Sequence, residues 1–218
     1  MGRFTNPRDL YFGEGARHEV KNLKGSRAMI VTGGGSMRRG GFLQDVEADL
    51  KEAGFEVEIF EGVESDPSVD TVMKGAKAME DFQPDWIIGI GGGSPLDAAK
   101  AVAVFAANDI PAEQLFTNSY ESGVLPIVAV PTTSGTGSEA TPWSVMTWHT
   151  VKTKRSFGSL QTYPCLALLD PTYTDSLPLA ITRSTAMDAF THCFESVISV
   201  KASPLTLSLI HISEPTRP

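Results

Sequence analysis

The feature that most constrains the fold of this chain is the stretch IIGIGGGSPLDAAKAVAVFA at residues 87–106. A short apolar run leads into three consecutive glycines, Gly91 to Gly93, and a helical pattern begins at Pro95. Proline suits the first turn of a helix because the N–H that it lacks would have no partner there. The stretch therefore predicts a buried strand, a tight turn and a helix, which together form the basic unit of an α/β fold.

The turn of this unit is suited to binding a phosphate group. Glycines let the backbone approach a ligand closely, and the following helix offers unpaired N–H groups at the positive end of its dipole. We therefore expect the pyrophosphate of a dinucleotide at Gly92, Gly93 and Ser94. A tight turn without a ligand is the alternative, but successive glycines cost conformational entropy that a plain turn does not require. The turn lacks the G-x-G-x-x-G fingerprint and follows the third strand-like run, so we expect a fold different from the common Rossmann dehydrogenases.

The first 176 residues repeat this alternation of strands and helices. Apolar runs that predict strands lie at residues 27–32, 55–60, 86–91, 126–130 and 165–170, and helical patterns lie at 41–54 and 67–82. Near-continuous apolar strands joined by helices indicate a parallel sheet covered on both faces. We expect an α/β dinucleotide-binding domain over residues 1–176. From about Leu177 the pattern is helical, which predicts the beginning of a second, all-helical domain over residues 177–206.

A second glycine-rich stretch, VAVPTTSGTGSEATPWSV at residues 128–145, also follows a strand and is rich in hydroxyl side chains. Hydroxyl groups such as those of Thr132 and Thr133 can hydrogen-bond phosphate or ribose without adding charge. Taken alone, the segment is explained equally well as a Ser/Thr-rich loop without a ligand.

The third stretch, VTGGGSMRRGG at residues 31–41, directly follows the first predicted strand. At this place a nucleotide-binding domain commonly carries a carboxylate that holds the adenine ribose and repels a 2′-phosphate. Here Gly33, Gly34, Gly35 and Ser36 stand instead, followed by the basic residues Arg38 and Arg39. This arrangement admits the additional phosphate of NADP. A loop with two solvated arginines is the alternative interpretation.

Asp188 and His192, in the helical stretch TAMDAFTHCFES at residues 185–196, are candidates for metal ligands. Side chains four residues apart on a helix lie on the same face, so a carboxylate and an imidazole can bind one ion there. Catalytic metals usually take three or four protein ligands, so this pair is half of a site. The alternative is a carboxylate favoured by the helix dipole and a histidine with a hydrogen-bond partner in the core.

Composition limits the range of partners. The formal net charge is −8 with a sequence pI near 5.0, which argues against nucleic acid or an anionic membrane surface as the main partner. No apolar run approaches the roughly 20 residues of a membrane-spanning helix. Two cysteines are too few for a disulfide framework, and the N-terminus lacks the apolar run of a secretory signal, so we expect a cytoplasmic protein.

The motifs GGGSPLDAAK, PTTSGTGSE and TAMDAFTHCFES, in this order, resemble those of the iron-containing (group III) alcohol dehydrogenases. The resemblance covers residues 1 to about 206, and the opening RFTNPRDLYFGEGA and the turn VTGGGSMRRGG look most like the NADPH-dependent butanol dehydrogenase branch. Members of this family combine an N-terminal α/β dinucleotide domain with a C-terminal helical domain. A divalent metal lies between the two domains.

The resemblance implies roles for individual residues. Gly92, Gly93, Ser94 and Asp97 would form the pyrophosphate turn, and Thr132, Thr133, Thr141 and Lys154 would line the rest of the cofactor site. Asp188 and His192 match the first two metal ligands of the family. The remaining two ligands would be histidines farther along, in helices that this chain does not contain.

The resemblance also implies an activity. The family transfers a hydride between a primary alcohol or aldehyde and NADP or NAD, with NADP favoured here, and uses iron or zinc as a Lewis acid. The full-length enzyme would be a homo-oligomer. With two metal ligands absent, we expect the 218-residue chain to be an inactive fragment.

Two other functions remain open from the sequence. Glycerol dehydrogenases and dehydroquinate synthases resemble the same two-domain arrangement, and the chain by itself could be a nucleotide-binding module without catalysis. The last residues, 207–218, resemble a translated sequencing adapter, because Pro215, Arg217 and Pro218 replace the helical pattern. We therefore expect a truncated dehydrogenase that carries a non-native tail.

Overall fold

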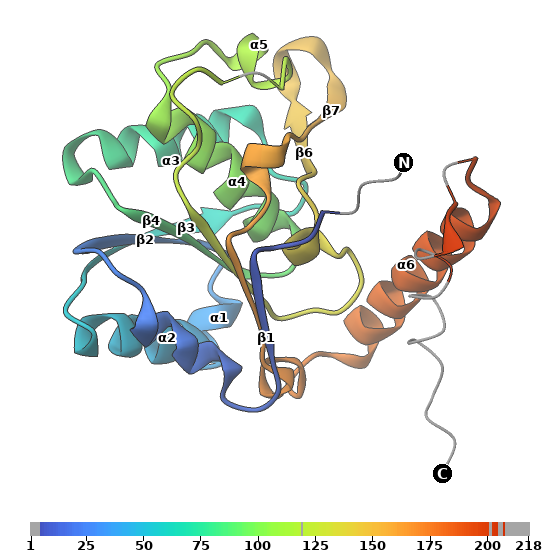
Figure 1. The fold of residues 1–218 in the computed structure, drawn as a ribbon, viewed down its shortest axis with the longest axis horizontal. Coiled ribbons are helices and arrows are strands. Elements are labelled where there is room, and N and C mark those ends of the chain that lie inside the picture. The colour runs from blue at the N-terminus through green and yellow to red at the C-terminus, as the bar shows by residue number, and fades with distance from the viewer. Residues whose placement is uncertain (1–4, 119, 201, 205–206, 208–218) are drawn as a thin grey trace.

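The computed structural model describes residues 5–118, 120–200, 202–204 and 207. Its centre is a six-stranded parallel sheet with the strand order β1-β8-β5-β4-β2-β3 (Figure 1). The strands are β1 (Asp9–Phe12), β2 (Arg27–Gly33), β3 (Glu56–Val63), β4 (Trp86–Gly91), β5 (Ile127–Pro131) and β8 (Leu166–Leu169). Five of them confirm the predicted strands, and the parallel sheet confirms the predicted α/β fold class. The predicted tail at 207–218 lies outside the described residues, apart from Leu207.

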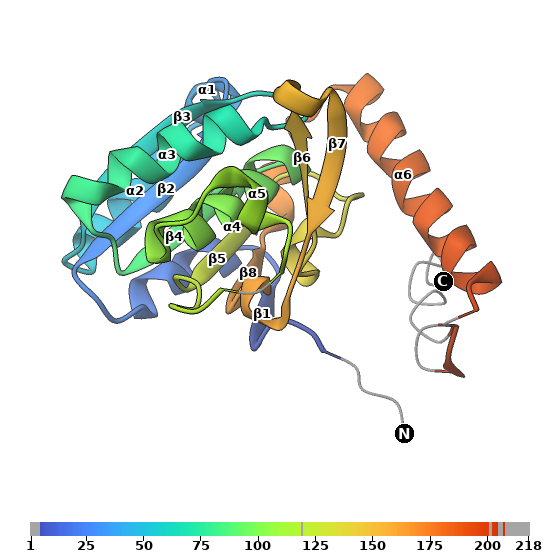
Figure 2. The same ribbon diagram turned by 90° about the horizontal axis from the view of Figure 1, so that it is seen from above.

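Helices cover both faces of the sheet, as the apolar strand sequences predict (Figures 1 and 2). Alternate residues of β2 point to opposite faces, so Met29 and Val31 join one hydrophobic core while Ala28 and Ile30 join the other. The first core contains side chains of α3 (Val69–Phe82) and α4 (Gly93–Ala107). The second contains side chains of α2 (Phe42–Glu52) and of the 3₁₀ helix η1 (Ala16–Asn22). Two separate cores therefore hold the sheet from both sides.

The helix boundaries have local causes. Ser68 caps the N-terminus of α3 by accepting a hydrogen bond from the backbone N–H of Thr71 at 3.2 Å. Helix α2 ends at Glu52, and Gly54 follows with a φ of +90°, which glycine adopts without strain. The remaining short elements are α1 (Ser36–Arg39), α5 (Ala112–Leu115), η2 (Ser138–Ala140), η3 (His149–Val151), η4 (Leu160–Thr162) and η5 (Pro171–Thr174).

Three strands were not predicted. The edge strand β1 is four residues long, and the antiparallel pair β6 (Ser144–Trp148) and β7 (Thr153–Phe157) forms a separate two-stranded sheet beside α4. Strand β7 reads TKRSF and leaves all but its last residue exposed, so it lacks the apolar signature of a buried strand. The pair packs through Met146, Trp148 and Phe157, which join the core beneath α3 and α4.

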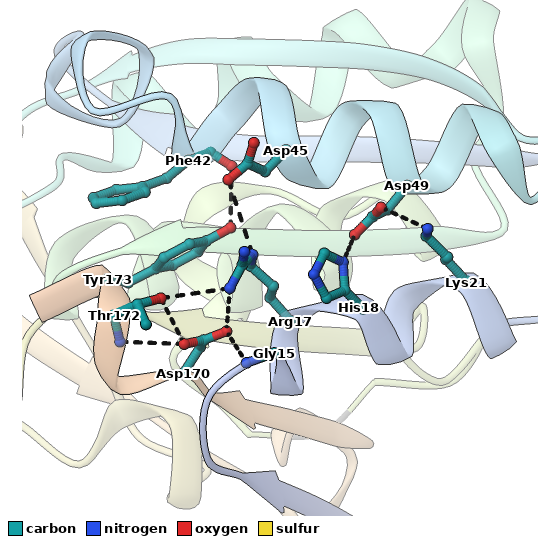
Figure 3. A network of polar contacts seen from close by, with 10 residues as sticks. All are labelled: Gly15, Arg17, His18, Lys21, Phe42, Asp45, Asp49, Asp170, Thr172 and Tyr173. Atoms are coloured by element: carbon teal, nitrogen blue, oxygen red, sulfur yellow. Dashed lines mark hydrogen bonds and ion pairs between the residues drawn. The ribbon is translucent and has the colours of Figure 1, made fainter.

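A buried polar network ties the N-terminal segment to the end of β8 (Figure 3). The Asp170 carboxylate accepts hydrogen bonds from the Gly15 backbone N–H at 2.9 Å and from Arg17 Nη1 at 2.6 Å. Its second oxygen accepts from the Thr172 hydroxyl at 2.7 Å, and the Arg17 guanidinium also lies over the Tyr173 ring. Buried carboxylates of this kind are stable only when their oxygens have partners. Asp170 therefore connects η1 to η5 at the carboxyl edge of the sheet.

Helix α6 (Leu179–Ile198) differs from the other α-helices because none of its side chains is buried. It lies away from the sheet in both views (Figures 1 and 2). Large apolar side chains such as Met187, Phe190 and Phe194 are each about three-fifths exposed, at 60%, 63% and 58%. In the part of the chain that the structure describes, no helix is long and apolar enough to cross a membrane.

Candidate dinucleotide-binding site

Three glycine- or hydroxyl-rich turns meet at one edge of the sheet. They follow β2, β4 and β5, which are neighbours in the strand order and run parallel. The chain proceeds from β2 outward to β3 and then returns to β4 on the other side of β2. Such a switch point opens a crevice outside the carboxyl ends of the strands, where ligands of α/β proteins bind. The structure thus brings together the three segments that sequence analysis selected separately.

The turn after β4 places the N-terminus of α4 at this edge of the sheet. Gly91 has a φ of +140°, and Gly92 occupies the N-cap without a side-chain hydrogen bond to the helix. The first turn of α4 contains no acidic residue. Its N–H groups therefore keep their full capacity to bind an anion.

Packing explains two of the three glycines in this turn. A Cβ on Gly91 would lie 2.8 Å from Pro95 Cγ, and a Cβ on Gly93 would lie 2.7 Å from Thr136 Cγ2. A Cβ on Gly92 would meet nothing closer than Thr133 Oγ1 at 3.4 Å, which is an ordinary contact. The entropic argument for a ligand therefore applies mainly to Gly92, because the fold itself requires the other two.

The loop after β5 packs against the turn after β4. Thr132 is buried, and its backbone N–H donates to the Gly91 carbonyl at 2.9 Å. Thr133 faces Gly92 and Thr136 faces Gly93. Thr141 is half-buried after η2. Hydroxyl groups of this loop are thereby placed beside the backbone N–H groups of α4.

Asp97 and Lys100 of α4 hold the far end of that loop. One Asp97 carboxylate oxygen accepts from the Ser138 hydroxyl at 2.6 Å, and the other accepts from the Val145 backbone N–H at 2.9 Å. Burial raises the pKa of Asp97, although Lys100, Ser138 and Val145 oppose this change. Asp97 was predicted to belong to the pyrophosphate turn. Its carboxylate is engaged with the loop after β5.

Ser94 and Lys154 meet at the loop after β3. The Ser94 hydroxyl accepts a hydrogen bond from the Asp66 backbone N–H at 3.3 Å, and Lys154 Nζ lies 2.7 Å from an Asp66 carboxylate oxygen. Both charged side chains are more than half exposed, at 54% for Lys154 and 66% for Asp66. An exposed ion pair of this kind contributes less than about 1 kcal/mol, so Lys154 can exchange Asp66 for another anion.

The turn after β2 lies beside the start of α4. A Cβ on Gly33 would lie 3.5 Å from Pro95 Cγ, which shows how closely this turn approaches the start of α4. A Cβ on Gly34 would meet no atom within 4 Å, and Ser36 is the first residue of α1. Arg38 forms a bidentate pair with Glu61, at 3.1 and 2.8 Å. Arg39 Nη1 lies 3.2 Å from the Cβ position of Gly35, and no carboxylate pairs with it in the described part of the chain.

Asp188 and His192 lie side by side on α6, as the helical spacing predicts. His192 Nε2 is 3.6 Å from an Asp188 carboxylate oxygen, and the two side chains are 58% and 43% exposed, respectively. No group of three or more metal-ligating side chains occurs among the described residues. Helix α6 contacts the loop after β5 one turn earlier, where a Cβ on Gly135 would lie 2.7 Å from the Thr185 carbonyl oxygen. The pair is therefore near the hydroxyl-rich loop.

Two residues of this site were missed by sequence analysis. Lys100 and Asp66 each contact a predicted site residue through a side chain or the backbone. Lys100 lies three residues after Asp97, which is the only sequence signal that associates it with the site. Asp66 comes from the loop after β3, and only the tertiary structure brings it close. Ser138 lies in the predicted stretch at 128–145, but its contact with Asp97 also depends on the tertiary structure.

A parallel sheet with glycine- and hydroxyl-rich turns at its switch point defines an α/β dinucleotide-binding domain. Residues 7–171 match the model of the iron-containing alcohol dehydrogenase family, and the chain belongs to that family. It is 45% identical over 213 residues to an NADPH-dependent butanol dehydrogenase of Clostridium saccharobutylicum, covering 94% of this chain and 54% of the relative.

Solved structures agree with this assignment. An iron-containing alcohol dehydrogenase of Thermotoga maritima matches with a TM-score of 0.89 and 38% identity, over 96% of this chain and 58% of that one. An NADH-dependent butanol dehydrogenase of the same organism matches with a TM-score of 0.88 and 29% identity, over 97% of this chain and 54% of that one. The family thus includes NADPH- and NADH-dependent relatives. The chain spans about half the length of the relatives it matches.

Proposed function

We propose that residues 1–176 form the dinucleotide-binding domain of a metal-dependent alcohol dehydrogenase that transfers a hydride between a primary alcohol and NAD(P). The observation that carries the proposal is the meeting of three phosphate- or ribose-compatible turns at the switch point of the sheet. The N-terminus of α4 fits a pyrophosphate, because its N-cap makes no side-chain hydrogen bond and no acidic side chain lies in the first turn.

The residues of the site have distinct roles in this proposal. Gly92, Gly93 and Ser94 bind the pyrophosphate, and Thr132 and Thr133 contact it from the facing loop. Thr141 and Lys154 line the part of the cofactor that lies toward α6. The dinucleotide supplies the hydride chemistry, while the protein supplies position and electrostatics.

We further propose that residues 177–206 begin the helical, metal-binding part of the enzyme. The pair Asp188 and His192 offers one oxygen and one nitrogen ligand, a set that suits iron or zinc. When bound, the metal would act as a Lewis acid toward the oxygen of the alcohol or aldehyde. Two ligands fit such an ion incompletely, so hydride transfer by the 218-residue chain alone is expected to be undetectable.

Direct binding measurements test the proposed function. NADPH fluorescence should change on titration with the purified chain and saturate at one site per chain, while butanol oxidation should stay at background. Failure of both NADPH and NADH to bind would contradict the proposal. Turnover of butanol by the chain would show instead that two metal ligands suffice.

NADPH is expected to bind more tightly than NADH by about tenfold. The 2′-phosphate would lie beside Gly34 and Ser36, and Arg39 is the nearby cation without a carboxylate partner. One charge-assisted hydrogen bond contributes roughly 1.5–3 kcal/mol, enough for a factor of ten or more. Arg39→Ala should bring the two affinities together, whereas Arg38→Ala should change their ratio less because Arg38 is paired with Glu61. Tighter binding of NADH by the unmodified chain would refute this preference.

Iron or zinc is expected to bind the chain weakly, with clearly less than one ion retained per chain after dialysis. The reason is that Asp188 and His192 supply two ligands, and no group of three or more metal-ligating side chains occurs among the described residues. His192→Ala should remove the remaining metal, while His149→Ala, at an exposed histidine outside α6, should not. Elemental analysis measures the metal content. If His192→Ala retained one full equivalent of metal per chain, the metal would have to bind at another site.

A further inference from the structure

Lys100 is the one lysine whose side chain is held in the interior of the described structure. It is 1% exposed and lies on α4, one turn after Asp97. Its Nζ donates three hydrogen bonds, to the Ser138 carbonyl at 2.7 Å, the Ser138 hydroxyl at 2.8 Å and the Trp143 carbonyl at 2.7 Å. A lysine buried to this extent is uncommon unless its ammonium is fully paired.

The three partners match the charged form of the amine. The carbonyls of Ser138 and Trp143 can only accept hydrogen bonds. The Ser138 hydroxyl donates its proton to Asp97 at 2.6 Å, so toward Lys100 it also acts as an acceptor. An ammonium has three N–H donors for these three acceptors, whereas a neutral amine has two. Deprotonation of Lys100 would leave one buried acceptor without a partner.

The segment that Lys100 holds is the far end of the hydroxyl-rich loop. Thr136 of this loop packs against Gly93. Ser138 is the first residue of η2, and Trp143 lies three residues after its end. The next strand, β6, is fastened to the same helix by the hydrogen bond from Val145 N–H to Asp97. Lys100 thus links the loop after β5 to the helix whose N-terminus forms the turn after β4.

We propose that Lys100 is a positioning residue for the dinucleotide site, whose ammonium fixes residues 136–145 against the turn at Gly92 to Ser94 and thereby sustains dinucleotide affinity. This inference rests on the proposed function of that turn. Lys100 acts through the loop and does not itself touch the cofactor. Loss of the ammonium would free the loop and weaken binding without removing any group that contacts the ligand.

The ionisation of Lys100 makes this role dependent on pH. Burial lowers the pKa of Lys100 to about 8, and the carboxylates of Asp97 and Glu139 oppose that change. These are the two acidic groups that act on the ammonium, from α4 and η2. Above pH 8 the ammonium therefore loses its proton in the folded chain. The 2′-phosphate of NADPH is a monoester with a second pKa near 6, so its charge no longer changes in that pH range.

The test compares NADPH affinity from pH 7 to pH 9.5 in three proteins. The unmodified 218-residue chain should lose affinity by about tenfold across this range, as expected for one buried acceptor left unpaired. Lys100→Met, which keeps the length but lacks the charge, should bind about tenfold more weakly at pH 7 and show no comparable pH dependence. Lys77→Met, at an exposed lysine on α3, should match the unmodified chain at every pH.

Amide hydrogen exchange separates a positioning role from a general effect on stability. In Lys100→Met, and in the unmodified chain at pH 9.5, protection should fall over residues 136–145 but stay unchanged in β4 and β5. Should Lys100→Met fail to fold, Ser138→Ala supplies the second variant. It removes the hydroxyl between Lys100 and Asp97, so it should weaken NADPH binding and loosen the same segment.

The outcomes distinguish this inference from the proposed function. If the unmodified chain binds NADPH with an affinity independent of pH, and Lys100→Met binds equally well, then Lys100 has no positioning role. If the unmodified chain binds neither NADPH nor NADH at any pH, the proposed function and this inference are both overturned. Uniform loss of protection throughout the sheet in a folded Lys100→Met protein would also overturn it, since the effect would then be global.

Discussion

Gly92→Val is expected to abolish dinucleotide binding, with a loss of at least about a hundredfold, while the domain still folds. Gly92 has φ −73° and ψ −168°, an extended conformation that β-branched residues adopt readily. Its Cβ would meet only Thr133, at an ordinary distance of 3.4 Å. The added methyl groups would project between the two turns, where the pyrophosphate must approach the backbone. Titration with NADPH measures the affinity, and circular dichroism checks the fold.

Two comparisons sharpen this prediction. Ala107→Val adds the same side chain at the other end of α4 and should leave NADPH affinity unchanged. Gly93→Ala is a less informative variant, because its Cβ would lie 2.7 Å from Thr136 and would displace the facing loop directly. Gly93→Val would likewise disturb packing as well as the ligand. Unchanged NADPH affinity in a folded Gly92→Val protein would show that the pyrophosphate does not bind at this turn.

Asp170→Ala is expected to destabilise the domain by about 3 kcal/mol or more. The substitution would leave the Gly15 N–H, the Arg17 guanidinium and the Thr172 hydroxyl without their carboxylate partner (Figure 3). Loss of one member of a buried ion pair costs more than the pair itself contributes, because the remaining charge stays desolvated. Urea denaturation at pH 7 measures the change in the free energy of unfolding.

The same carboxylate gives the stability of the domain a predictable dependence on pH. Burial alone would raise the pKa of Asp170, but hydrogen bonds from Thr172, Arg17 and Gly15 outweigh it and hold the pKa below its usual value. A lowered pKa means that the unfolded chain binds the proton first. The stabilisation is therefore present above about pH 4 and is lost as the pH falls through the folded-state value.

An exposed aspartate nearby provides the control for both measurements. Asp175→Ala, just after η5, should change the free energy of unfolding by less than about 0.5 kcal/mol. Its acid denaturation should match that of the unmodified chain. Equal stability of Asp170→Ala and Asp175→Ala at pH 7 would show that the Asp170 network contributes no net stability.

The sequence by itself determined the central architecture, because the information that specifies it is local. Strands β2, β4, β5 and β8 are short apolar runs between turn residues, and helices α2 and α3 carry apolar positions at helical spacing. Glycines and hydroxyls directly after the strands also identified the three turns. Since parallel strands end at one edge, the meeting of these turns followed once their strands were neighbours. The sequence also predicted that Asp188 and His192 lie side by side, because their spacing of four residues places them on one face of a helix.

Only the tertiary structure decided which polar side chains are buried and what they bind. No local pattern shows that Lys100 and Asp170 are buried with hydrogen-bond partners whereas Lys77 and Asp175 are exposed. Lys100 is separated by 38 residues from Ser138, and Asp170 by 155 from Gly15, so their partners come together only when the sheet is assembled. The same holds for Gly91 and Gly93, whose missing side chains make room for Pro95 and Thr136. Hydrophobic periodicity reports where a segment buries apolar surface, whereas the partner of a buried charge depends on the packing of distant segments.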